Sequence, residues 1–391
     1  MSTSLPPLVQ PAAELTREEV ARYSRHLIIP DLGVDGQKRL KNAKVLVIGA
    51  GGLGSPALLY LAAAGVGTIG IVEFDVVDES NLQRQIIHGQ SDIGRSKAES
   101  ARDSIREINP LVNVRLHELR LEPENAVELF EQYDLILDGT DNFATRYLVN
   151  DAAVLAGKPY VWGSIYRFEG QVSVFWEDAP DGAGLNYRDL YPEPPPPGMV
   201  PSCAEGGVLG ILCASIASVM GTEAIKLITG IGEPLLGRLM VYDALEMSYR
   251  TIKIRKDPET PKITELIDYE DFCGVVSEDA SEAAVGSTVT PSELREMIDG
   301  GRVALIDVRE PVEWDINRIT GAQLVPKSTL ESGEGLAALP HDRIPVLYCK
   351  TGVRSAEALV AVKKAGFADA KHLQGGIVAW ARQLEPDMVM Y

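Results

Sequence analysis

Lys44-Val-Leu-Val-Ile48 runs directly into the glycine-rich segment Gly49-Ala-Gly51-Gly52-Leu-Gly54, and Ser55-Pro56 follow at the expected start of a helix. A run of apolar, largely β-branched residues is typical of a buried parallel strand. A glycine-rich turn between a strand and a helix lets the backbone approach a phosphate, and the helix N-terminus supplies unpaired N–H donors and a partial positive charge. The segment predicts a nucleotide-binding loop. A tight turn without a ligand is the alternative.

The same alternation of strands and helices continues along the chain. A helix is expected over 56–64, and strands over Thr68–Val72 and Tyr133–Asp138. Strands that alternate with helices indicate βαβ units and a parallel sheet, so the predicted fold is a Rossmann-like α/β domain. Glu73 ends the second strand, where it is placed to accept hydrogen bonds from a ribose hydroxyl. Up to this point a dinucleotide-dependent enzyme fits equally well.

Two cations and a carboxylate at the carboxyl edge of this sheet favour a triphosphate over a dinucleotide. Arg84 lies in SNLQRQ, Lys97 ends GRSK, and Asp141 lies in TDN directly after a strand. Hydride transfer needs a flat ring near the substrate and does not need this set of charges. Cleavage of a triphosphate builds charge on the departing pyrophosphate, and Lys, Arg and Mg²⁺ stabilise that charge.

Seven motifs in order resemble the MoeB/ThiF class of the ubiquitin-activating superfamily, over about residues 12–255: RYSRH, GAGGLG, SNLQRQ, GRSK, TDN, RFEGQ and CAEGGVLG. The resemblance implies an enzyme that uses ATP and Mg²⁺ to adenylate the C-terminal Gly-Gly carboxylate of a ubiquitin-like sulfur-carrier protein. It implies that the following residues bind ATP: Gly52, Glu73, Ser80, Asn81, Leu82, Gln83, Arg84, Lys97, Asp141 and Asn142. Arg84, Lys97 and Asp141 would also act in the reaction, with Asp141 near Mg²⁺. Arg25 would reach the phosphates of the neighbouring subunit, which implies a homodimer.

The sequence departs from this class at two places. Glu73 stands where the class usually has Asp, and its side chain is one methylene longer. Members of the class commonly carry two Cys-x-x-Cys pairs that hold a structural zinc. The corresponding segments here are Asn186-Tyr-Arg-Asp189 and 257–262, and neither contains a thiol. Asn and Asp are poor replacements for zinc thiolates, so we expect no structural zinc.

Cys203 is a candidate second thiol of the reaction. It ends a proline-rich segment, 186–202, that is expected to be a loop, and it precedes a helix expected over 208–229. A helix dipole at that position favours the thiolate. By resemblance, a cysteine in this setting attacks the acyl group of the carrier or helps to release the sulfurated product. A buried, inert thiol is the alternative, and Cys213 and Cys273 are both interpreted as non-catalytic.

A second cysteine-containing loop lies near the end of the chain. The expected strand Pro345–Tyr348 runs into Cys349-Lys350-Thr351-Gly352-Val353-Arg354, and a helix is expected from about Ser355. Backbone N–H groups, a helix dipole and two cations stabilise an anion at this thiol, either a thiolate or a persulfide. A cysteine phosphatase places five residues between Cys and Arg, whereas this loop has four.

Together with LIDVRE (305–310) and QGGIVAW (374–380), the shorter loop resembles a single rhodanese domain over about residues 288–385. The resemblance implies a persulfide on Cys349. A phosphatase and an inactive binding module are the alternatives. Between Asp268 and Ser287 the chain has six acidic residues and no Lys or Arg, which is typical of a linker. The predicted domains are therefore an adenylyltransferase domain (12–265), an acidic linker (266–287) and a small α/β rhodanese domain (288–391).

Composition limits the class of partner and the location. The formal net charge of −19 disfavours nucleic acid, because binding to a phosphate backbone would have to overcome the protein's own repulsion. The longest apolar run, Val208–Met220, is shorter than the roughly 20 residues of a membrane span. The first 15 residues lack the pattern of a signal peptide, so we expect a cytoplasmic protein without a membrane contact. Four cysteines without a Cys-x-x-Cys pair suggest no disulfide framework.

The two sites together predict one reaction sequence. The first domain adenylates the carrier with MgATP and releases pyrophosphate; Cys349, loaded by thiosulfate or by the persulfide of a cysteine desulfurase, then attacks the acyl-adenylate and expels AMP. A second thiol, either Cys203 or an external reductant, releases the carrier thiocarboxylate. The chain resembles MoeB–rhodanese fusion proteins, which implies that its product is used in the synthesis of molybdenum cofactor, thiolated transfer RNA or cysteine. The alternatives are a nicotinamide-dependent oxidoreductase with a regulatory rhodanese module, and a non-catalytic scaffold that binds carriers.

Overall fold

A computed structural model describes residues 5–11, 14–195, 206–273, 283–284 and 286–391. These residues form two compact units, one that ends at Cys273 and one that runs from Gly274 to Tyr391. Each unit has its own sheet and its own hydrophobic core. The predicted fold class, a Rossmann-like domain followed by a small α/β domain, is confirmed.

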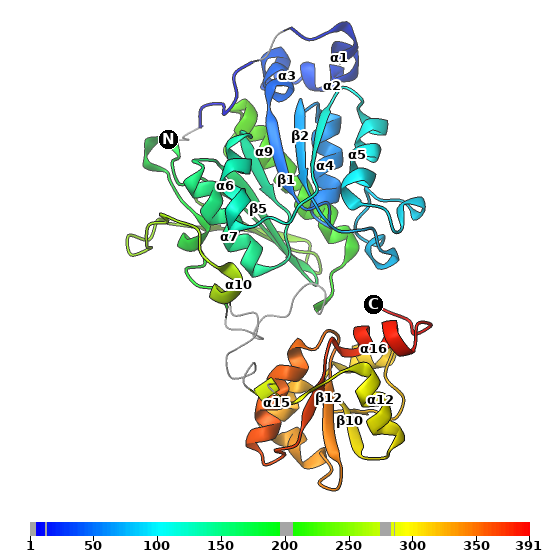
Figure 1. The fold of residues 1–391 in the computed structure, drawn as a ribbon. Helices are drawn as coiled ribbons and strands as arrows, with labels where there is room; N and C mark the ends of the chain where they lie inside the picture. The colour runs from blue at the N-terminus through cyan, green and yellow to red at the C-terminus, as the bar shows by residue number, and fades with distance from the viewer. Residues whose placement is uncertain (1–4, 12–13, 196–205, 274–282, 285) are drawn as a thin grey trace. The chain divides into compact units, whose positions relative to one another are not determined.

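The first unit is built on an eight-stranded sheet with the order β3-β2-β1-β4-β5-β6-β7-β8 (Figure 1). Its strands are β1 (Lys44–Ile48), β2 (Thr68–Val72), β3 (Asn113–His117), β4 (Leu135–Asp138), β5 (Tyr160–Tyr166), β6 (Glu169–Phe175), β7 (Arg238–Asp243) and β8 (Ser248–Lys253). The first five strands of the sheet are parallel, and β6, β7 and β8 continue it antiparallel. The parallel half brings the carboxyl ends of β1, β2 and β4 to one edge.

Helices cover both faces of this sheet (Figure 1). They are α1 (Arg17–Arg22), α2 (Ser24–Leu27), α3 (Gly33–Asn42), α4 (Gly54–Ala64), α5 (Lys97–Ile108), α6 (Pro123–Glu131), α7 (Phe143–Leu155), α9 (Gly210–Thr229) and α10 (Tyr269–Phe272), with short 3₁₀ turns at Glu79–Asn81, Gln90–Asp92, Pro180–Gly182 and Tyr187–Asp189. One core lies between the sheet and α3, α4, α5 and α9, and the other lies under α6 and α7. Because both faces of the parallel strands are buried, β1 and β2 have no polar face, as their sequences predict.

The helix α9 is long and apolar enough to cross a membrane by length and composition alone. It extends nine residues beyond Met220, through Glu223 and Lys226, which form an ion pair at 2.5 Å. Glu223 also accepts a hydrogen bond from Leu235 N at 2.6 Å. The helix contacts α4 and β5, and residues such as Leu212 and Ile216 are fully buried there, so the apolar composition of α9 serves the protein core.

The second unit contains a five-stranded, fully parallel sheet with the order β11-β10-β12-β13-β9. Its strands are β9 (Thr288–Val289), β10 (Val303–Asp307), β11 (Gln323–Leu324), β12 (Ile344–Tyr348) and β13 (Lys371–Leu373). Its helices are α12 (Pro291–Asp299), α13 (Pro311–Ile316), α14 (Lys327–Ser332), α15 (Val353–Lys364) and α16 (Gly376–Leu384), with a 3₁₀ turn at Glu334–Ala338. Two clusters of buried apolar residues lie on the two faces of the sheet.

Two local predictions need correction. The segment 186–202 was predicted to contain no helix, but Tyr187–Asp189 forms a 3₁₀ turn because Asn186 caps it through a hydrogen bond from Arg188 N at 2.8 Å. The helix that follows the Cys349 loop, α15, begins at Val353 and not near Ser355. Val353 and Arg354 therefore lie in the first turn of α15, which leaves a shorter loop between Cys349 and the helix.

Candidate functional sites

The glycine loop joins β1 to α4 at the carboxyl edge of the sheet. Gly49 adopts φ +90°, a left-handed conformation that disfavours any residue with a side chain. A Cβ atom at Gly54 would lie 1.9 Å from the carbonyl oxygen of Gly49, so the loop closes on itself and requires glycine there as well. A backbone packed this tightly at a helix start can bring its N–H groups to a phosphate.

Glu73 contacts this loop through its carboxylate. Its Oε2 atom accepts a hydrogen bond from Ala50 N at 3.0 Å, and Oε1 accepts bonds from Phe74 N and Asp75 N, both at 2.9 Å. The residue is 7% exposed. The longer side chain of Glu therefore reaches back to the glycine loop and fixes its position. The predicted contact to a ribose remains a prediction.

The segment 80–84 lies beside the same loop. A Cβ atom at Gly52 would lie 3.7 Å from Arg84 Cγ and 2.9 Å from Cys213 Sγ. Arg84 donates from Nη1 to the carbonyl oxygen of Ser80 at 3.1 Å. Asp78 caps the turn that carries Ser80 and Asn81, while Leu82 and Gln83 follow it. The structure thus brings Gly52 and Arg84 together, and it places the buried Cys213 thiol behind the loop.

Lys97 begins α5 and lies close to the end of β2. Its Nζ atom is 3.2 Å from Asp75 Oδ2, and its backbone N–H donates to the carbonyl oxygen of Asp75 at 2.9 Å. The Lys97 side chain is 8% exposed, whereas that of Asp75 is 56% exposed. Asp75 follows the strand that carries Glu73, so Lys97 lies at the sheet edge predicted from the sequence.

Asp141 and Asn142 lie in the loop that joins β4 to α7, and both are exposed. Asn142 caps α7 by accepting a hydrogen bond from Thr145 N at 2.8 Å. Gly139 N donates to the carbonyl oxygen of Ile48 at 3.2 Å, so this loop starts next to the glycine loop. The cap fixes the position of Asn142. The Asp141 side chain is exposed to solvent.

Asp138, at the end of β4, is a residue that the sequence analysis missed. Its Oδ1 atom accepts hydrogen bonds from the backbone and side chain of Thr140 at 2.9 and 2.6 Å. Its Oδ2 atom is buried without a hydrogen-bond partner in the part of the chain that the structure describes. Burial raises the pKa of Asp138 to about 6, and the nearby Asp141 carboxylate contributes. A buried strand sequence alone gives no signal for such a carboxylate.

Two other predicted residues complete the account of this site. Arg25 lies in α2 and is exposed, and no hydrogen bond within the described residues joins it to the glycine loop. Cys203 lies outside the described residues. His88 is buried, and its two ring nitrogens form hydrogen bonds with Ser100 Oγ at 2.8 Å and with the carbonyl oxygen of Ala50 at 3.2 Å. The hydrogen bond to Ala50 joins His88 to the glycine loop.

The two segments without cysteine pairs meet through an ionic cluster, which we call the acid–lysine cluster: Glu177, Asp189 and Lys256. Lys256 Nζ lies 2.6 Å from Glu177 Oε2 and 3.2 Å from Asp189 Oδ2. Asp189 also accepts hydrogen bonds from Asn186 N at 2.8 Å and Asp257 N at 3.1 Å. Although burial by itself would raise the pKa of Glu177, the hydrogen bonds from Lys256 and Asn186 lower it. Carboxylates and an ammonium group thus join the two segments at which the sequence resemblance implied cysteine pairs.

We expect Asp189→Ala to lower the free energy of unfolding by about 2 kcal/mol, because two backbone N–H groups and an ammonium group lose a buried acceptor. The Asp189 side chain is fully buried, whereas the Lys256 side chain is 43% exposed, so Lys256→Met is expected to cost about 1 kcal/mol or less. Chelator should not change the melting temperature. Asp257→Ala, at an exposed carboxylate in the same segment, is the matched control. One tightly bound zinc per chain, found by metal analysis, would contradict this account.

The second candidate site surrounds Cys349, which follows β12. The residue is fully buried, and its Sγ atom accepts a hydrogen bond from Gly352 N at 3.1 Å. Gly352 adopts φ +104°, a conformation open to glycine, and this turn aims its N–H at the sulfur. Thr351 is exposed. A thiol held by a backbone N–H at the start of a helix is stabilised as an anion, so the loop suits a thiolate or a persulfide.

The cations of this loop are placed by partners outside it. Arg354 pairs with Glu313 of α13 through two hydrogen bonds, from Nη1 to Oε2 at 2.7 Å and from Nη2 to Oε1 at 2.9 Å. Lys350 Nζ lies 4.3 Å from the centre of the Tyr391 ring. Glu313 and Tyr391 were not recognised from the sequence, because they lie 41 and 78 positions from their partners along the chain.

The first unit is thus a nucleotide-binding α/β fold with charged loops at one sheet edge, and the second is a small α/β unit with a buried thiol. The chain belongs to the ThiF family, whose model matches residues 23–262. A rhodanese-like domain model matches residues 290–383. Family membership favours adenylation over the nicotinamide-dependent chemistry that the glycine loop alone left open.

Known proteins similar to this chain carry one or both activities in their names. The probable adenylyltransferase/sulfurtransferase MoeZ of Mycobacterium tuberculosis is 84% identical over 100% of both chains. The sulfur carrier protein adenylyltransferase of Thermus thermophilus is 53% identical and covers 66% of this chain and 98% of its own length. The adenylyltransferase and sulfurtransferase MOCS3 of Drosophila ananassae is 40% identical, with 97% of this chain and 87% of its own length covered.

Among solved structures, E. coli MccB with MccA-N7isoASN has a TM-score of 0.55 at 20% identity and covers 65% of this chain and 74% of that one. At this level of identity the likeness shows the fold alone.

Proposed function

We propose that this protein adenylates the C-terminal carboxylate of a ubiquitin-like sulfur carrier and then converts that carboxylate to a thiocarboxylate with sulfur from its rhodanese-like unit. The observation that carries the proposal is the presence, in one chain, of a ThiF-family nucleotide site and a cysteine loop built to hold an anion at sulfur. Relatives named for both activities span nearly the whole chain. In this proposal, residues 12–265 carry out adenylation, residues 266–287 form the linker, and residues 288–391 carry out sulfur transfer.

In the first half-reaction, the carrier carboxylate attacks the α-phosphorus of ATP, an acyl-adenylate forms and pyrophosphate leaves. The glycine loop, with its N–H groups at the start of α4, binds phosphate, and Arg84 and Lys97 meet the charge that builds on the pyrophosphate. The residues also fit Mg²⁺, since this ion is commonly bound by one carboxylate together with substrate phosphates, and Asp141 is an exposed carboxylate at that edge. Bound Mg²⁺ would neutralise charge on the triphosphate. Ser80, Asn81, Leu82, Gln83 and Asn142 complete the ATP-binding set.

In the second half-reaction, the terminal sulfur of a Cys349 persulfide attacks the acyl carbon, the bond to the phosphate breaks and AMP leaves. The product is an acyl disulfide between carrier and Cys349. A second thiol then attacks the sulfur of Cys349, so that the carrier departs as a thiocarboxylate and Cys349 is left in a disulfide with that thiol. Cys203 or an external reductant supplies the second thiol. A further external thiol reduces this disulfide and is itself oxidised, so that Cys349 returns to the thiolate. The thiolate then takes the outer sulfur from thiosulfate or from the persulfide of a cysteine desulfurase.

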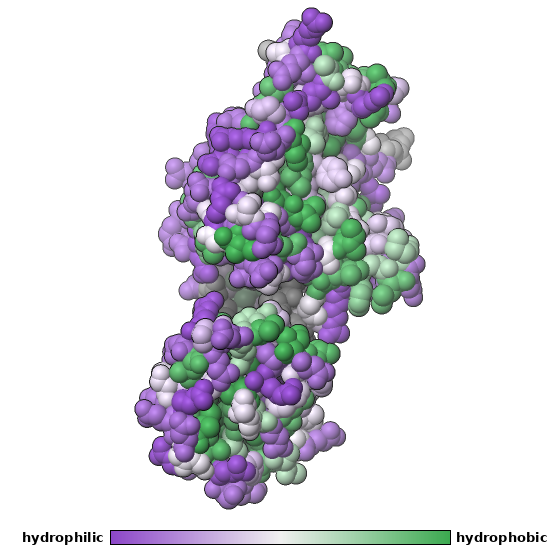
Figure 2. Space-filling view, turned by 90° about the vertical axis from the view of Figure 1, so that its right-hand side faces the viewer, coloured by the Kyte–Doolittle hydropathy of each residue, from purple (hydrophilic) through white to green (hydrophobic). Residues whose placement is uncertain are grey.

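We further propose a cytoplasmic homodimer, in which Arg25 serves the neighbouring subunit. Cys213, Cys273 and Cys349 form no disulfide among the described residues, which suits a reducing compartment. Figure 2 shows hydrophobic residues among hydrophilic ones on the surface, and exposed apolar side chains of the first unit include Tyr60, Ile86 and Ile211. The homodimer follows from the family resemblance, and these side chains are candidates for the contact between the subunits.

The experiment that tests the proposed function is the intact mass of candidate Gly-Gly carrier proteins after incubation with this enzyme, MgATP and thiosulfate. We expect a gain in mass equal to the exchange of one oxygen for sulfur, and no gain when ATP is omitted. No gain with any carrier, despite a persulfide on Cys349, would separate the two activities and overturn the coupled reaction.

A further inference from the structure

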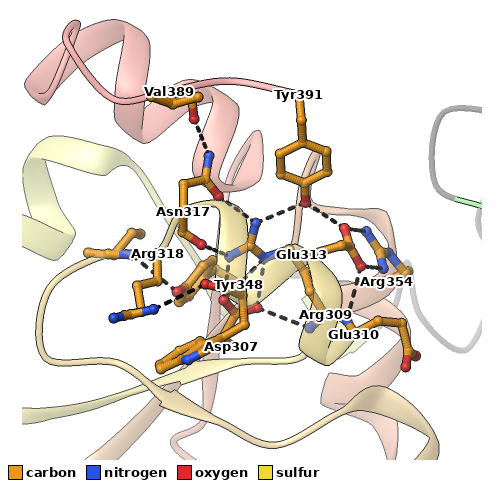
Figure 3. Close-up of polar contacts among 12 residues, drawn as sticks. Asp307, Arg309, Glu310, Glu313, Asn317, Arg318, Tyr348, Arg354, Val389 and Tyr391 are labelled. Atoms are coloured by element: carbon orange, nitrogen blue, oxygen red, sulfur yellow. Dashed lines mark hydrogen bonds and ion pairs between the residues drawn. The ribbon is translucent and has the colours of Figure 1, made fainter. Parts of the chain in front are cut away.

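The Tyr391 hydroxyl group joins two parts of a polar network in the second unit, one around Arg309 and one around Glu313 (Figure 3). This hydroxyl group accepts a hydrogen bond from Arg309 Nη1 at 2.9 Å and donates one to Glu313 Oε1 at 2.5 Å. Burial and the hydrogen bond to Glu313 raise the pKa of Tyr391, so the phenol stays protonated and remains the donor to Glu313. The directions of both hydrogen bonds are therefore fixed.

On one side, Tyr391 is fixed to a buried ion pair. Arg309 is fully buried and donates from Nε and Nη2 to the carboxylate of Asp307, with the shortest contact at 2.6 Å. Its remaining N–H groups donate to Asn317 O, Asn317 Oδ1 and the hydroxyl of Tyr391. All five donors of this guanidinium thus have an acceptor. The Asn317 side chain also donates to the carbonyl oxygen of Val389 at 2.6 Å, so the segment around Tyr391 is held at two points.

On the other side, Tyr391 fixes the partner of Arg354. The Glu313 carboxylate receives the two bonds from Arg354, one from Glu310 N at 3.0 Å and the one from Tyr391. Although burial by itself would raise it, the pairing with Arg354 and the hydrogen bond from Tyr391 lower the pKa of Glu313 to about 2. The carboxylate is ionised at any working pH, and it holds the guanidinium in a fixed plane at the first turn of α15.

The ring of Tyr391 contacts the other cation of the loop. Lys350, the residue after Cys349, places its Nζ atom 4.3 Å from the ring centre, within the range of a cation–π contact. One side chain therefore acts on both cations that accompany the thiol, directly on Lys350 and through Glu313 on Arg354.

We propose that Tyr391 is a positioning residue of the sulfur site, which holds Lys350 and Arg354 where they bind the charged groups of an anionic sulfur donor. The inference rests on the proposed sulfurtransferase function. With thiosulfate, the Cys349 thiolate attacks the outer sulfur, the S–S bond breaks, and its electron pair leaves with sulfite. Two cations held in place bind this dianion with a smaller loss of side-chain freedom than two mobile ones.

The test uses the full chain, with thiosulfate as donor and cyanide as acceptor, so that sulfite and thiocyanate are the products. Tyr391→Phe keeps the ring and removes the hydroxyl, and the KM for thiosulfate should rise about tenfold. Tyr391→Leu also removes the ring, and KM should rise about threefold further. In both variants kcat should change less than KM. Val389→Ala is the matched control, because the Val389 side chain is exposed and its carbonyl contact to Asn317 stays in place.

The outcomes separate this inference from the function on which it rests. If the unmodified protein transfers no sulfur from thiosulfate to cyanide, the proposed sulfurtransferase function fails. If it does transfer sulfur and both Tyr391 variants keep its KM, the positioning role fails. A lower kcat with unchanged KM would mean fewer folded sites, as for a purely structural residue, and would equally overturn the inference. A rise in KM that is larger for Leu than for Phe supports it.

Discussion

Cys349→Ala is expected to abolish formation of the carrier thiocarboxylate and to leave carrier-dependent ATP–pyrophosphate exchange within about twofold of the unmodified rate. The substitution removes the sulfur atom on which the persulfide forms. Alanine keeps a small apolar side chain at this fully buried position in the hydrophobic core of the second unit, so that unit should stay folded. Exchange depends on the glycine loop and its charged neighbours, which belong to a unit with its own core.

Two assays on the same preparations measure this separation: exchange of labelled pyrophosphate into ATP, and the intact mass of the carrier. Cys273→Ala is the matched control, because it removes a half-buried thiol from the first unit and should leave both activities in place. Loss of exchange in Cys349→Ala would contradict the two-site scheme, since adenylation would then need the sulfur nucleophile.

The parts of this fold that the sequence predicted are those encoded locally. β1, β2 and the glycine loop are adjacent in the chain, and each has a pattern that a strand or a phosphate-binding turn requires. The loop that begins at Cys349 is likewise one continuous segment between a strand and a helix. Such elements could be predicted without knowledge of what packs against them.

The parts that were missed depend on residues far apart in the chain. The acid–lysine cluster joins Lys256 to Glu177 across 79 positions, and no spacing rule links a lone lysine to a lone glutamate. In the sequence, Asp138 is indistinguishable from the last residue of an ordinary strand. Its pKa is raised only because the folded sheet and α7 bury it. Glu73 was predicted as a ribose ligand, yet its extra methylene also lets it reach Ala50 N, a contact set by how two strands pair.

Asp141→Ala is expected to lower carrier-dependent pyrophosphate exchange at least about 100-fold, because a carboxylate at the phosphate site is lost together with the Mg²⁺ that it would hold. The side chain is exposed, so the variant should fold and keep its melting temperature. Asp141→Asn keeps the size and removes the charge, and it should be nearly as slow. Excess MgCl₂ should restore little of the rate, since the missing group is part of the site's geometry as well as its charge.

Asp178→Ala, at an exposed carboxylate elsewhere in the first unit, is the matched control and should exchange at the unmodified rate. The rhodanese assay with thiosulfate and cyanide provides the second control, because the Cys349 loop lies in the other unit and should be unaffected by Asp141→Ala. Exchange at the full rate in Asp141→Ala would place the catalytic carboxylate elsewhere. Asp138 would then be the next residue to test. It ends β4, the strand that directly precedes Asp141, and its Oδ2 atom has no hydrogen-bond partner among the described residues.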